Sequence, residues 1–249
     1  MDISHCRVCN SSQLVDVIDL GVQPWGNDMV THENVGKERK YPLVCCFCLQ
    51  CSTLQVRYTV PKEIMYSDHS YLSGANKSMP DHFQKVADYV FDNYCNTDGA
   101  LAVDIGSNDG TLLRCYQRNN FNVLGVEASA EIAKIACDAG IPTIANYFNR
   151  ELAVSIESSH SKADVISAAN VFYHVEDLHS VVEGIKCLLA DNGVFVVQAS
   201  YLPSLVETKA FDIMYHEHLL YYRMENLQTL LSLHDLEAFD YSFEDVHGG

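Results

Sequence analysis

The sequence predicts an α/β protein, in which a mostly parallel sheet with helices on both faces follows a small cysteine-rich module. Two observations support this prediction. Between residues 99 and 245, apolar strand-like runs alternate with amphipathic helical patterns, a rhythm typical of parallel sheets with crossover helices. Residues 1–60 differ in composition, because they hold six of the ten cysteines together with short strand-like runs.

The elements follow in order along the chain. In the N-terminal region, the runs at 14–20 and 52–60 alternate or are rich in β-branched residues, which favours strands. Residues 61–98 form a linker rich in tyrosine, serine and glycine that ends in a helical pattern. Four apolar runs then predict consecutive strands of the parallel sheet, at residues 101–106, 122–128, 163–170 and 193–200.

Composition limits the classes of function. With 48% hydrophobic and 20% charged residues in 249, the chain can bury a full core. The net charge is −17, and residues 86–249 carry 24 acidic against 8 basic residues. Such a surface repels a phosphate backbone, so we expect no nucleic-acid partner. There is no signal-peptide pattern and no apolar run of about 18 residues, so we expect a soluble, cytoplasmic protein without a membrane partner.

Two CxxC pairs, Cys6-x-x-Cys9 and Cys48-x-x-Cys51, predict a metal site in the module. In a reducing compartment, cysteines are metal ligands or core thiols rather than disulfides. Four thiolates satisfy tetrahedral zinc and leave no open position, so the predicted zinc is structural. Cys45 and Cys48 form a further CxxC, and buried free cysteines are the plain alternative. We prefer Cys48, because Cys45 and Cys46 end the apolar run "YPLVCC" and have the character of strand residues.

The run "LAVDIGSNDGTLL" at residues 101–113 predicts a cofactor loop. Its strand ends with Asp104, after which Gly106 and Gly110 lead into a helix. Glycines allow the backbone to approach a ligand, and a helix N-terminus offers free amide groups. Glu127 ends the next predicted strand, where an acidic side chain suits a grip on ribose hydroxyls. The G-x-G-x-x-G pattern expected for a nicotinamide cofactor is absent.

This loop and the downstream glutamate resemble motifs I and II of class I S-adenosylmethionine-dependent methyltransferases, which have a Rossmann-like fold. The resemblance implies that Asp104 serves the amino acid part of the cofactor, directly or through water. It places Asn108 among the cofactor-binding residues of the loop. Asn170, at the end of "ADVISAAN", matches the strand end beside the methyl donor.

Five motifs in order resemble the sugar C-methyltransferase family, which methylates nucleotide-linked keto-deoxysugars. They are the zinc module, "YLSGANKSM", "DIGSNDGTLL", "NVFYHVEDLH" and "FDIMYHEHLLYY". The resemblance implies three parts: a zinc-binding module at 1–60, a linker and helix at 61–98 that contributes to the active site, and a cofactor-binding domain at 99–245. It also implies a further C-terminal domain, missing after residue 249. It leaves the oligomeric state open.

The stretch "MYHEHLLYY", residues 214–222, places a base, a carboxylate and phenols together. Methylation at carbon needs removal of a proton beside a ketone and stabilisation of the enolate oxygen. By the family resemblance, His218 is the base and Glu217 and Tyr215 are its partners. His174 and Tyr71 match further pocket positions.

Several alternatives stay open at this stage. Tyr66 is the alternative to Tyr71, because the linker aligns loosely. His216 and His218 alternate along the chain and can be read as metal ligands, although "HEH" lacks the HExxH pattern, or as plain polar strand residues. The activity can instead be O- or N-methylation of another small metabolite, or cofactor binding without catalysis.

Overall fold

A computed structural model describes residues 1–27, 29–65, 72–75, 78–244 and 246 of the chain. Contacts group the chain into two compact units built from separate segments. Unit 1 joins residues 1–69, 172–179 and 199–249, and unit 2 joins residues 70–171 and 180–198. The domain boundaries expected at residues 60, 98 and 245 therefore remain predictions.

Unit 2 contains a sheet of five parallel strands, in the order β6-β5-β4-β7-β8. Each of the four predicted strand runs forms one of them, and the short β6 is an addition. The predicted α/β class is confirmed. The strands are β4 (Leu101–Ile105), β5 (Asn122–Glu127), β6 (Thr143–Ala145), β7 (Ala163–Ala169) and β8 (Leu189–Gln198).

The strand order reverses between β4 and β7. The chain runs outward from β4 through β5 to β6, and then returns to the other side of β4 to form β7 and β8. In open α/β sheets, ligands bind outside the carboxyl ends of the strands at such a reversal. The topology therefore predicts a ligand site near Asp104, close to the end of β4, and Asn170, directly after β7.

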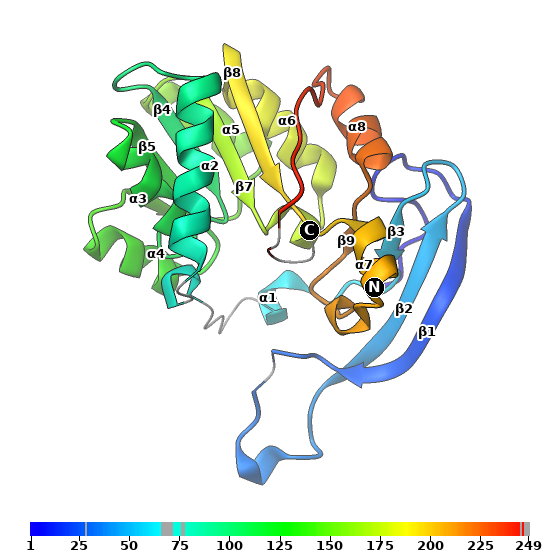
Figure 1. Ribbon diagram of the computed structural model, residues 1–249. Coiled ribbons are helices and arrows are strands. Elements are labelled where there is room, and N and C mark those ends of the chain that lie inside the picture. Colours follow the sequence, from blue (N-terminus) through cyan, green and yellow to red (C-terminus); the bar gives the residue numbers. More distant parts are fainter. Residues whose placement is uncertain (28, 66–71, 76–77, 245, 247–249) are drawn as a thin grey trace. The chain divides into compact units, whose positions relative to one another are not determined.

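Helices cover both faces of this sheet, and Figure 1 shows α2 in front of the strands with α5 and α6 behind them. The helix α2 presents Met79, Phe83, Ala87 and Val90 to the core, at the spacing of one helical face. A proline stands in its first turn, where no intrahelical donor is needed. The helices are α2 (Met79–Asn93), α3 (Thr111–Arg118), α4 (Ala130–Asp138), α5 (Arg150–Ser159) and α6 (Leu178–Leu188), and the short η2 spans Ser73–Ala75.

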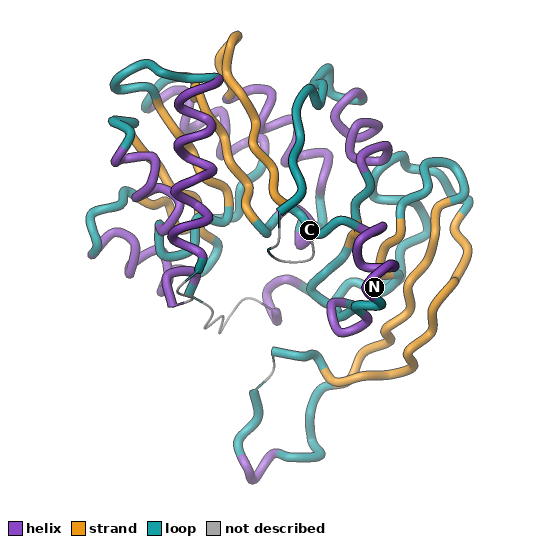
Figure 2. The backbone as a smooth tube through the Cα atoms, viewed as in Figure 1, coloured by secondary structure: helices purple, strands orange, loops and turns teal. Residues whose placement is uncertain are grey.

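Unit 1 is built on an antiparallel sheet in the order β1-β2-β3-β9. The first three strands come from the cysteine-rich module: β1 (Leu14–Pro24), β2 (Lys40–Cys48) and β3 (Leu54–Val56). The long pair β1–β2 is seen as two neighbouring orange strands in Figure 2. The fourth strand, β9 (Leu220–Tyr221), belongs to the stretch "MYHEHLLYY". This stretch therefore completes the sheet of the module.

The core of unit 1 lies on this sheet. Leu43 and Cys45 of β2 and Leu54 and Val56 of β3 are buried there with residues from the second half of the chain: Leu202, Leu205, Met214 and Tyr221. The remaining elements are η1 (His32–Asn34), α1 (Lys62–Met65), η3 (Phe172–His174), α7 (Leu202–Thr208), η4 (Phe211–Ile213) and α8 (Met224–Ser232). Among the described helices, none is both long enough and apolar enough to cross a bilayer.

Candidate functional site

Four cysteines of unit 1 form a cluster with the geometry of a tetrahedral metal site. The sulfurs of Cys6, Cys9, Cys48 and Cys51 all lie within 4.8 Å of one another. The Sγ–Sγ distances of Cys6 to Cys51 and of Cys9 to Cys48 are both 3.6 Å. A tetrahedron with zinc–sulfur bonds of about 2.3 Å has edges of about 3.8 Å. The donor set and its spacing thus fit one zinc ion.

The two CxxC turns have the same backbone conformation. In each, the residue four positions after the first cysteine has a positive φ, 57° at Asn10 and 59° at Ser52. Its amide donates to the carbonyl of the first cysteine, and that cysteine's own amide donates to the residue one position further on, Ser11 or Thr53. These turns point both sulfurs of a pair toward the same centre.

Donors around Cys6 favour the thiolate form that zinc requires of its ligands. The hydrogen bond from Cys51 lowers the pKa of Cys6, against the opposing effect of burial, and the same contact raises the pKa of Cys51. The amide of Val8 and the Nε2 group of Gln55 also donate to Sγ of Cys6, at 3.4 and 3.2 Å. Such outer contacts orient metal ligands and tune their charge.

Cys45 lies outside the cluster. It is in the middle of β2 and packs in the apolar core of unit 1. Burial raises the pKa of its thiol to about 12, so it is a core thiol and not a ligand. The structure resolves the choice between Cys45 and Cys48 in favour of Cys48.

In unit 2, the predicted cofactor loop connects β4 to α3. Gly106 and Gly110 have φ angles of 68° and 77°, which favour glycine. A Cβ atom at Gly106 would lie 2.6 Å from Val171, and one at Gly110 would lie 2.9 Å from Ile141. The glycines are thus required by the packing of the loop as well as by its curvature, a reason that the sequence did not reveal.

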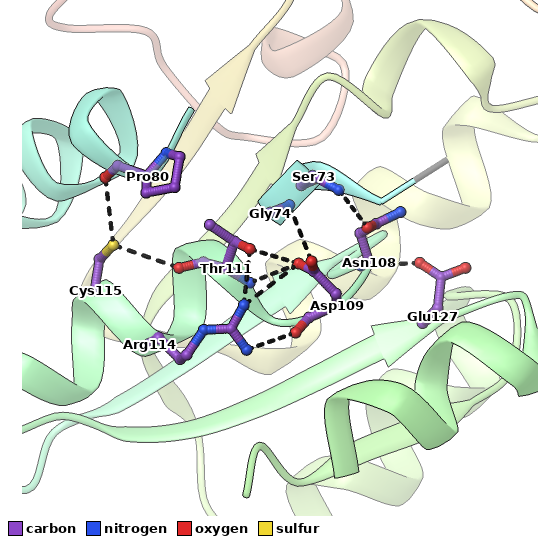
Figure 3. Close-up of polar contacts among 9 residues, drawn as sticks. All are labelled: Ser73, Gly74, Pro80, Asn108, Asp109, Thr111, Arg114, Cys115 and Glu127. Atoms are coloured by element: carbon purple, nitrogen blue, oxygen red, sulfur yellow. Dashed lines mark hydrogen bonds and ion pairs between the residues drawn. The ribbon is translucent and has the colours of Figure 1, made fainter. Parts of the chain in front are cut away.

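Glu127 ends β5 and holds this loop. Its Oε2 atom accepts from the amide of Asn108 at 3.0 Å (Figure 3). Its Oε1 atom accepts from the amide of Ser129 at 2.9 Å. The side chain is 8% exposed. A carboxylate has about four acceptor positions, so the two amides leave capacity for ribose hydroxyls.

Asp104 is buried below the loop, where Oγ of Ser167 donates to its Oδ1 at 2.6 Å. Burial raises its pKa to about 7, the hydrogen bond from Ser167 opposes this shift, and the charge of Glu127 adds to it. Near neutral pH, this carboxyl is therefore poised to change its charge when a cation arrives.

A residue that sequence reasoning passed over, Asp109, connects the loop to the linker (Figure 3). Its Oδ2 atom accepts from the amide of Gly74 at 2.9 Å, and Oδ1 of the neighbouring Asn108 accepts from the amide of Ser73 at 2.9 Å. Oδ1 of Asp109 accepts from the amide and the hydroxyl of Thr111, and Nη2 of Arg114 lies 3.6 Å from the same oxygen. The only sequence signal was the polar triplet "SND" between the two glycines.

Asn170 follows β7 with a φ of 59°. Its amide donates to the carbonyl of Gln198 at 3.0 Å, and Nε2 of Gln198 donates to its Oδ1 at 3.2 Å. The Oε1 atom of Gln198 lies 2.7 Å from Nε2 of the buried His82. Asn170 is thus held at the strand reversal by residues of β8 and α2.

The histidine-rich stretch forms a compact cluster within unit 1. The hydroxyl of Tyr215 lies 2.8 Å from Nε2 of His218, and Nδ1 of His218 lies 2.9 Å from the carbonyl of Ile213. The ring centroids of His174 and His218 are 5.1 Å apart, and Nδ1 of His174 lies 2.7 Å from the carbonyl of Glu217. The residues predicted for proton transfer are therefore brought together.

Glu217 is turned toward the loop after β1. Its carboxylate, 2% exposed, accepts from the indole Nε1 of Trp25 at 2.7 Å and from Nδ2 of Asn27 at 2.5 Å. No local pattern in the sequence could connect Trp25 to a residue 192 positions away.

His216 is separate from this cluster. It is buried, and its Nε2 atom lies 3.2 Å from the carbonyl of Tyr41. Apart from the four cysteines, no described group of three or more His, Cys, Asp or Glu side chains is close enough to hold a metal. The arrangement gives no support to a metal at "HEH". Tyr71 and its alternative Tyr66 lie outside the described residues.

Two family models match the chain. Residues 6–66 match a putative zinc binding domain, and residues 76–240 match a methyltransferase domain. The predictions of zinc and S-adenosylmethionine as cofactors agree with these two domains.

A protein that is similar to this chain over most of its length is also described as a methyltransferase. The chain is 32% identical over 248 residues to a protein described as C-methyltransferase NovU, from Streptomyces niveus. The match covers 99% of this chain, and the chain spans 59% of the length of that relative.

A solved complex of the Trm112 methyltransferase activator and a putative methyltransferase from Haloferax volcanii matches with a TM-score of 0.52 and 16% identity. It covers 67% of this chain and 74% of that chain, and at this identity it supports the fold alone. The parallel sheet and the glycine loop are consistent with the methyltransferase domain that matches residues 76–240. The chain belongs to the methyltransferase domain family, with a putative zinc binding domain at its N-terminus.

Proposed function

We propose that the chain carries the catalytic residues of an S-adenosylmethionine-dependent C-methyltransferase, which methylates a nucleotide-linked keto-deoxysugar through an enolate. The observation that carries the proposal is the pairing of Tyr215 with Nε2 of His218. The name of the Streptomyces relative, a C-methyltransferase, supports transfer to carbon.

His218 is the proposed base. The carbonyl of Ile213, 2.9 Å from Nδ1, can only accept a hydrogen bond, so Nδ1 carries the proton of the neutral ring. Nε2 is then the basic nitrogen, and the Tyr215 hydroxyl donates to it. An imidazole with its second nitrogen fixed by a carbonyl has the tautomer that a general base needs.

Tyr215 is the proposed donor to the enolate oxygen. Burial, and secondarily the charge of Glu217, raises the pKa of its hydroxyl well above its usual value. The side chain therefore stays a neutral phenol. When Nε2 of His218 takes up the substrate proton, it becomes a donor to the Tyr215 oxygen, and the phenol O–H is released to donate to the developing oxyanion. Glu217 is proposed to bind a hydroxyl of the sugar, and His174 and Tyr71 are proposed to line the same pocket.

The loop of unit 2 is the proposed cofactor site. Glu127 would bind the ribose, Asp104 would face the charged amino acid part, and the backbone from Gly106 through Asn108 to Gly110 would form the cradle. Asn170 would lie beside the methyl donor. When bound, S-adenosylmethionine supplies the methyl group to the enolate carbon. The zinc ion is proposed to stabilise the module and to take no part in the chemistry.

The test is proton exchange measured together with methyl transfer. With a thymidine-diphosphate keto-deoxyhexose as acceptor, the wild-type protein should exchange the proton beside the ketone with deuterated water. His218→Ala should lower exchange and methylation together by about 10²–10⁴-fold, the usual contribution of a general base. His216→Ala is the control, because this buried side chain lies outside the cluster and its loss should leave exchange in place.

Two results would contradict the proposal. One is methylation at a near wild-type rate by His218→Ala. The other is methyl transfer to oxygen or nitrogen of the acceptor with no exchange at carbon, which would favour an O- or N-methyltransferase. The experiment needs folded protein, so the zinc content and thermal unfolding of each variant are measured first.

A further inference from the structure

The carboxylate of Glu217 is held by one of its two oxygens. Both Nε1 of Trp25, at 2.7 Å, and Nδ2 of Asn27, at 2.5 Å, donate to Oε1. A carboxylate oxygen has two lone pairs directed at donors, so these two hydrogen bonds saturate Oε1. Among the described residues, no donor reaches Oε2.

Neither donor is charged. No lysine or arginine in the described part of the chain forms an ion pair with Glu217. A buried carboxylate needs donors, because an unsolvated charge is costly. Neutral donors meet this need and leave the negative charge in place, so Oε2 remains a strong acceptor for a ligand hydroxyl.

The position of Trp25 is fixed by packing within the module. Its ring is buried together with Val60 and Met65. It directly follows β1, whose pairing with β2 runs from Leu14 opposite Cys48 to Pro24 opposite Lys40. The same strand pair thus begins at a zinc ligand and ends beside the residue that holds Glu217.

We propose, resting on the function proposed above, that Trp25 and Asn27 are positioning residues for Glu217. They cap Oε1 and leave Oε2 to accept a hydroxyl of the methyl acceptor. The N-terminal module then has a second task besides binding zinc, since its loop after β1 orients a side chain that selects the acceptor.

The first experiment measures tryptophan fluorescence and does not depend on methyltransferase activity. Trp25 is the one tryptophan of the chain, so the intrinsic fluorescence excited at the red edge of absorption reports on its indole group alone. Glu217→Gln replaces the charged partner of that indole and should change the emission intensity or wavelength. Glu225→Gln, which alters an exposed carboxylate on α8 in the same unit, should leave the emission unchanged.

The second arm measures specificity. Trp25→Phe keeps an aromatic ring against Val60 and Met65 but removes the donor. It should lower kcat/KM for the thymidine-diphosphate keto-deoxyhexose by about 10-fold to 100-fold, the range for a lost hydrogen bond to a charged group. The change should appear mainly in KM. Affinity for S-adenosylmethionine and zinc content should stay at wild-type values, which a general loss of folding would not allow.

The outcomes separate this proposal from the function on which it rests. Unchanged tryptophan emission in Glu217→Gln overturns the positioning role, and so does an unchanged kcat/KM in Trp25→Phe. If the wild-type protein does not methylate the sugar nucleotide, the proposed function fails. Calorimetric binding of the same sugar nucleotide then decides, because equal affinity of wild type and Trp25→Phe overturns the positioning role and weaker binding by the variant supports it.

Discussion

The amide of Gly74 donates to Oδ2 of Asp109 at 2.9 Å, and a Cβ atom on Gly74 would lie 2.6 Å from that same oxygen. A side chain at this position therefore requires the Asp109 carboxylate or the backbone at Gly74 to shift. Since Ser73 is held in the same way by Asn108, whose amide is in turn held by Glu127, the linker and the cofactor loop form one connected network.

We predict that Gly74→Ala separates the linker from the cofactor loop. The overlap with Asp109 should displace η2 and remove two hydrogen bonds, so affinity for S-adenosylmethionine should fall by about 1 kcal/mol for each bond lost. Isothermal titration measures this. Ser73→Ala is the control, because its backbone amide still donates to Asn108. Equal affinities of Gly74→Ala and wild type would show that the linker does not support the cofactor site.

We predict that Cys48→Ser loses the zinc ion and unfolds the module, since such sites supply part of the folding free energy. Cys45→Ser is the matched control in the same strand. It should keep about one zinc per chain and lose only some stability, because it places a hydroxyl in an apolar core. Metal analysis of both proteins gives the answer. Retained zinc in Cys48→Ser together with lost zinc in Cys45→Ser would contradict the ligand set.

We predict that Glu127→Gln weakens binding of S-adenosylmethionine by about 1.5–3 kcal/mol, the range for hydrogen bonds to a charged group. Glutamine keeps the shape of the side chain but loses the charge and one acceptor oxygen, which also loosens Asn108 or Ser129. Glu131→Gln, an exposed position on α4, is the control. Unchanged affinity in a folded Glu127→Gln protein would remove the main support for the cofactor site.

We predict that binding of the cationic cofactor releases a proton from Asp104. Its pKa in the free protein is about 7, and a nearby positive charge lowers the pKa of a carboxyl. Affinity should therefore rise as the pH is raised through about 7 and level off above it. Calorimetry in two buffers of different ionisation enthalpy measures the released proton, and Asp104→Asn should show none from this group. Equal proton release in both proteins would argue against this role.

The raised pKa of Asp104 also predicts how the free energy of unfolding depends on pH. The pKa of Asp104 is higher in the folded protein than its usual 3.8, so the folded state binds the proton more tightly than the unfolded state. The resulting stabilisation is fully present below about pH 4 and is lost as the pH rises through about 7. Asp104→Asn should lack this decline. Urea unfolding of both proteins at a series of pH values, after correction for zinc content, measures the difference.

The sequence by itself determined the features that depend on neighbouring residues. Two CxxC turns, a glycine loop between a strand and a helix, and Glu127 at the next strand end are local patterns, and each has its expected conformation. The alternation of strands and helices likewise gave the parallel sheet, because period and length are set within each segment. The family resemblance carried the rest of the predicted site.

Only the tertiary structure decided the features that depend on packing between distant segments. Cys45 and Cys48 are both plausible ligands by spacing. The structure distinguishes them, because Cys45 is buried in the apolar core of unit 1. The sequence also could not place β9 in the sheet of the module, or pair Trp25 with Glu217 across 192 residues. Hydrogen bonds of this kind form because folding removes both partners from water at the same place, and no periodicity along the chain records which partners will meet.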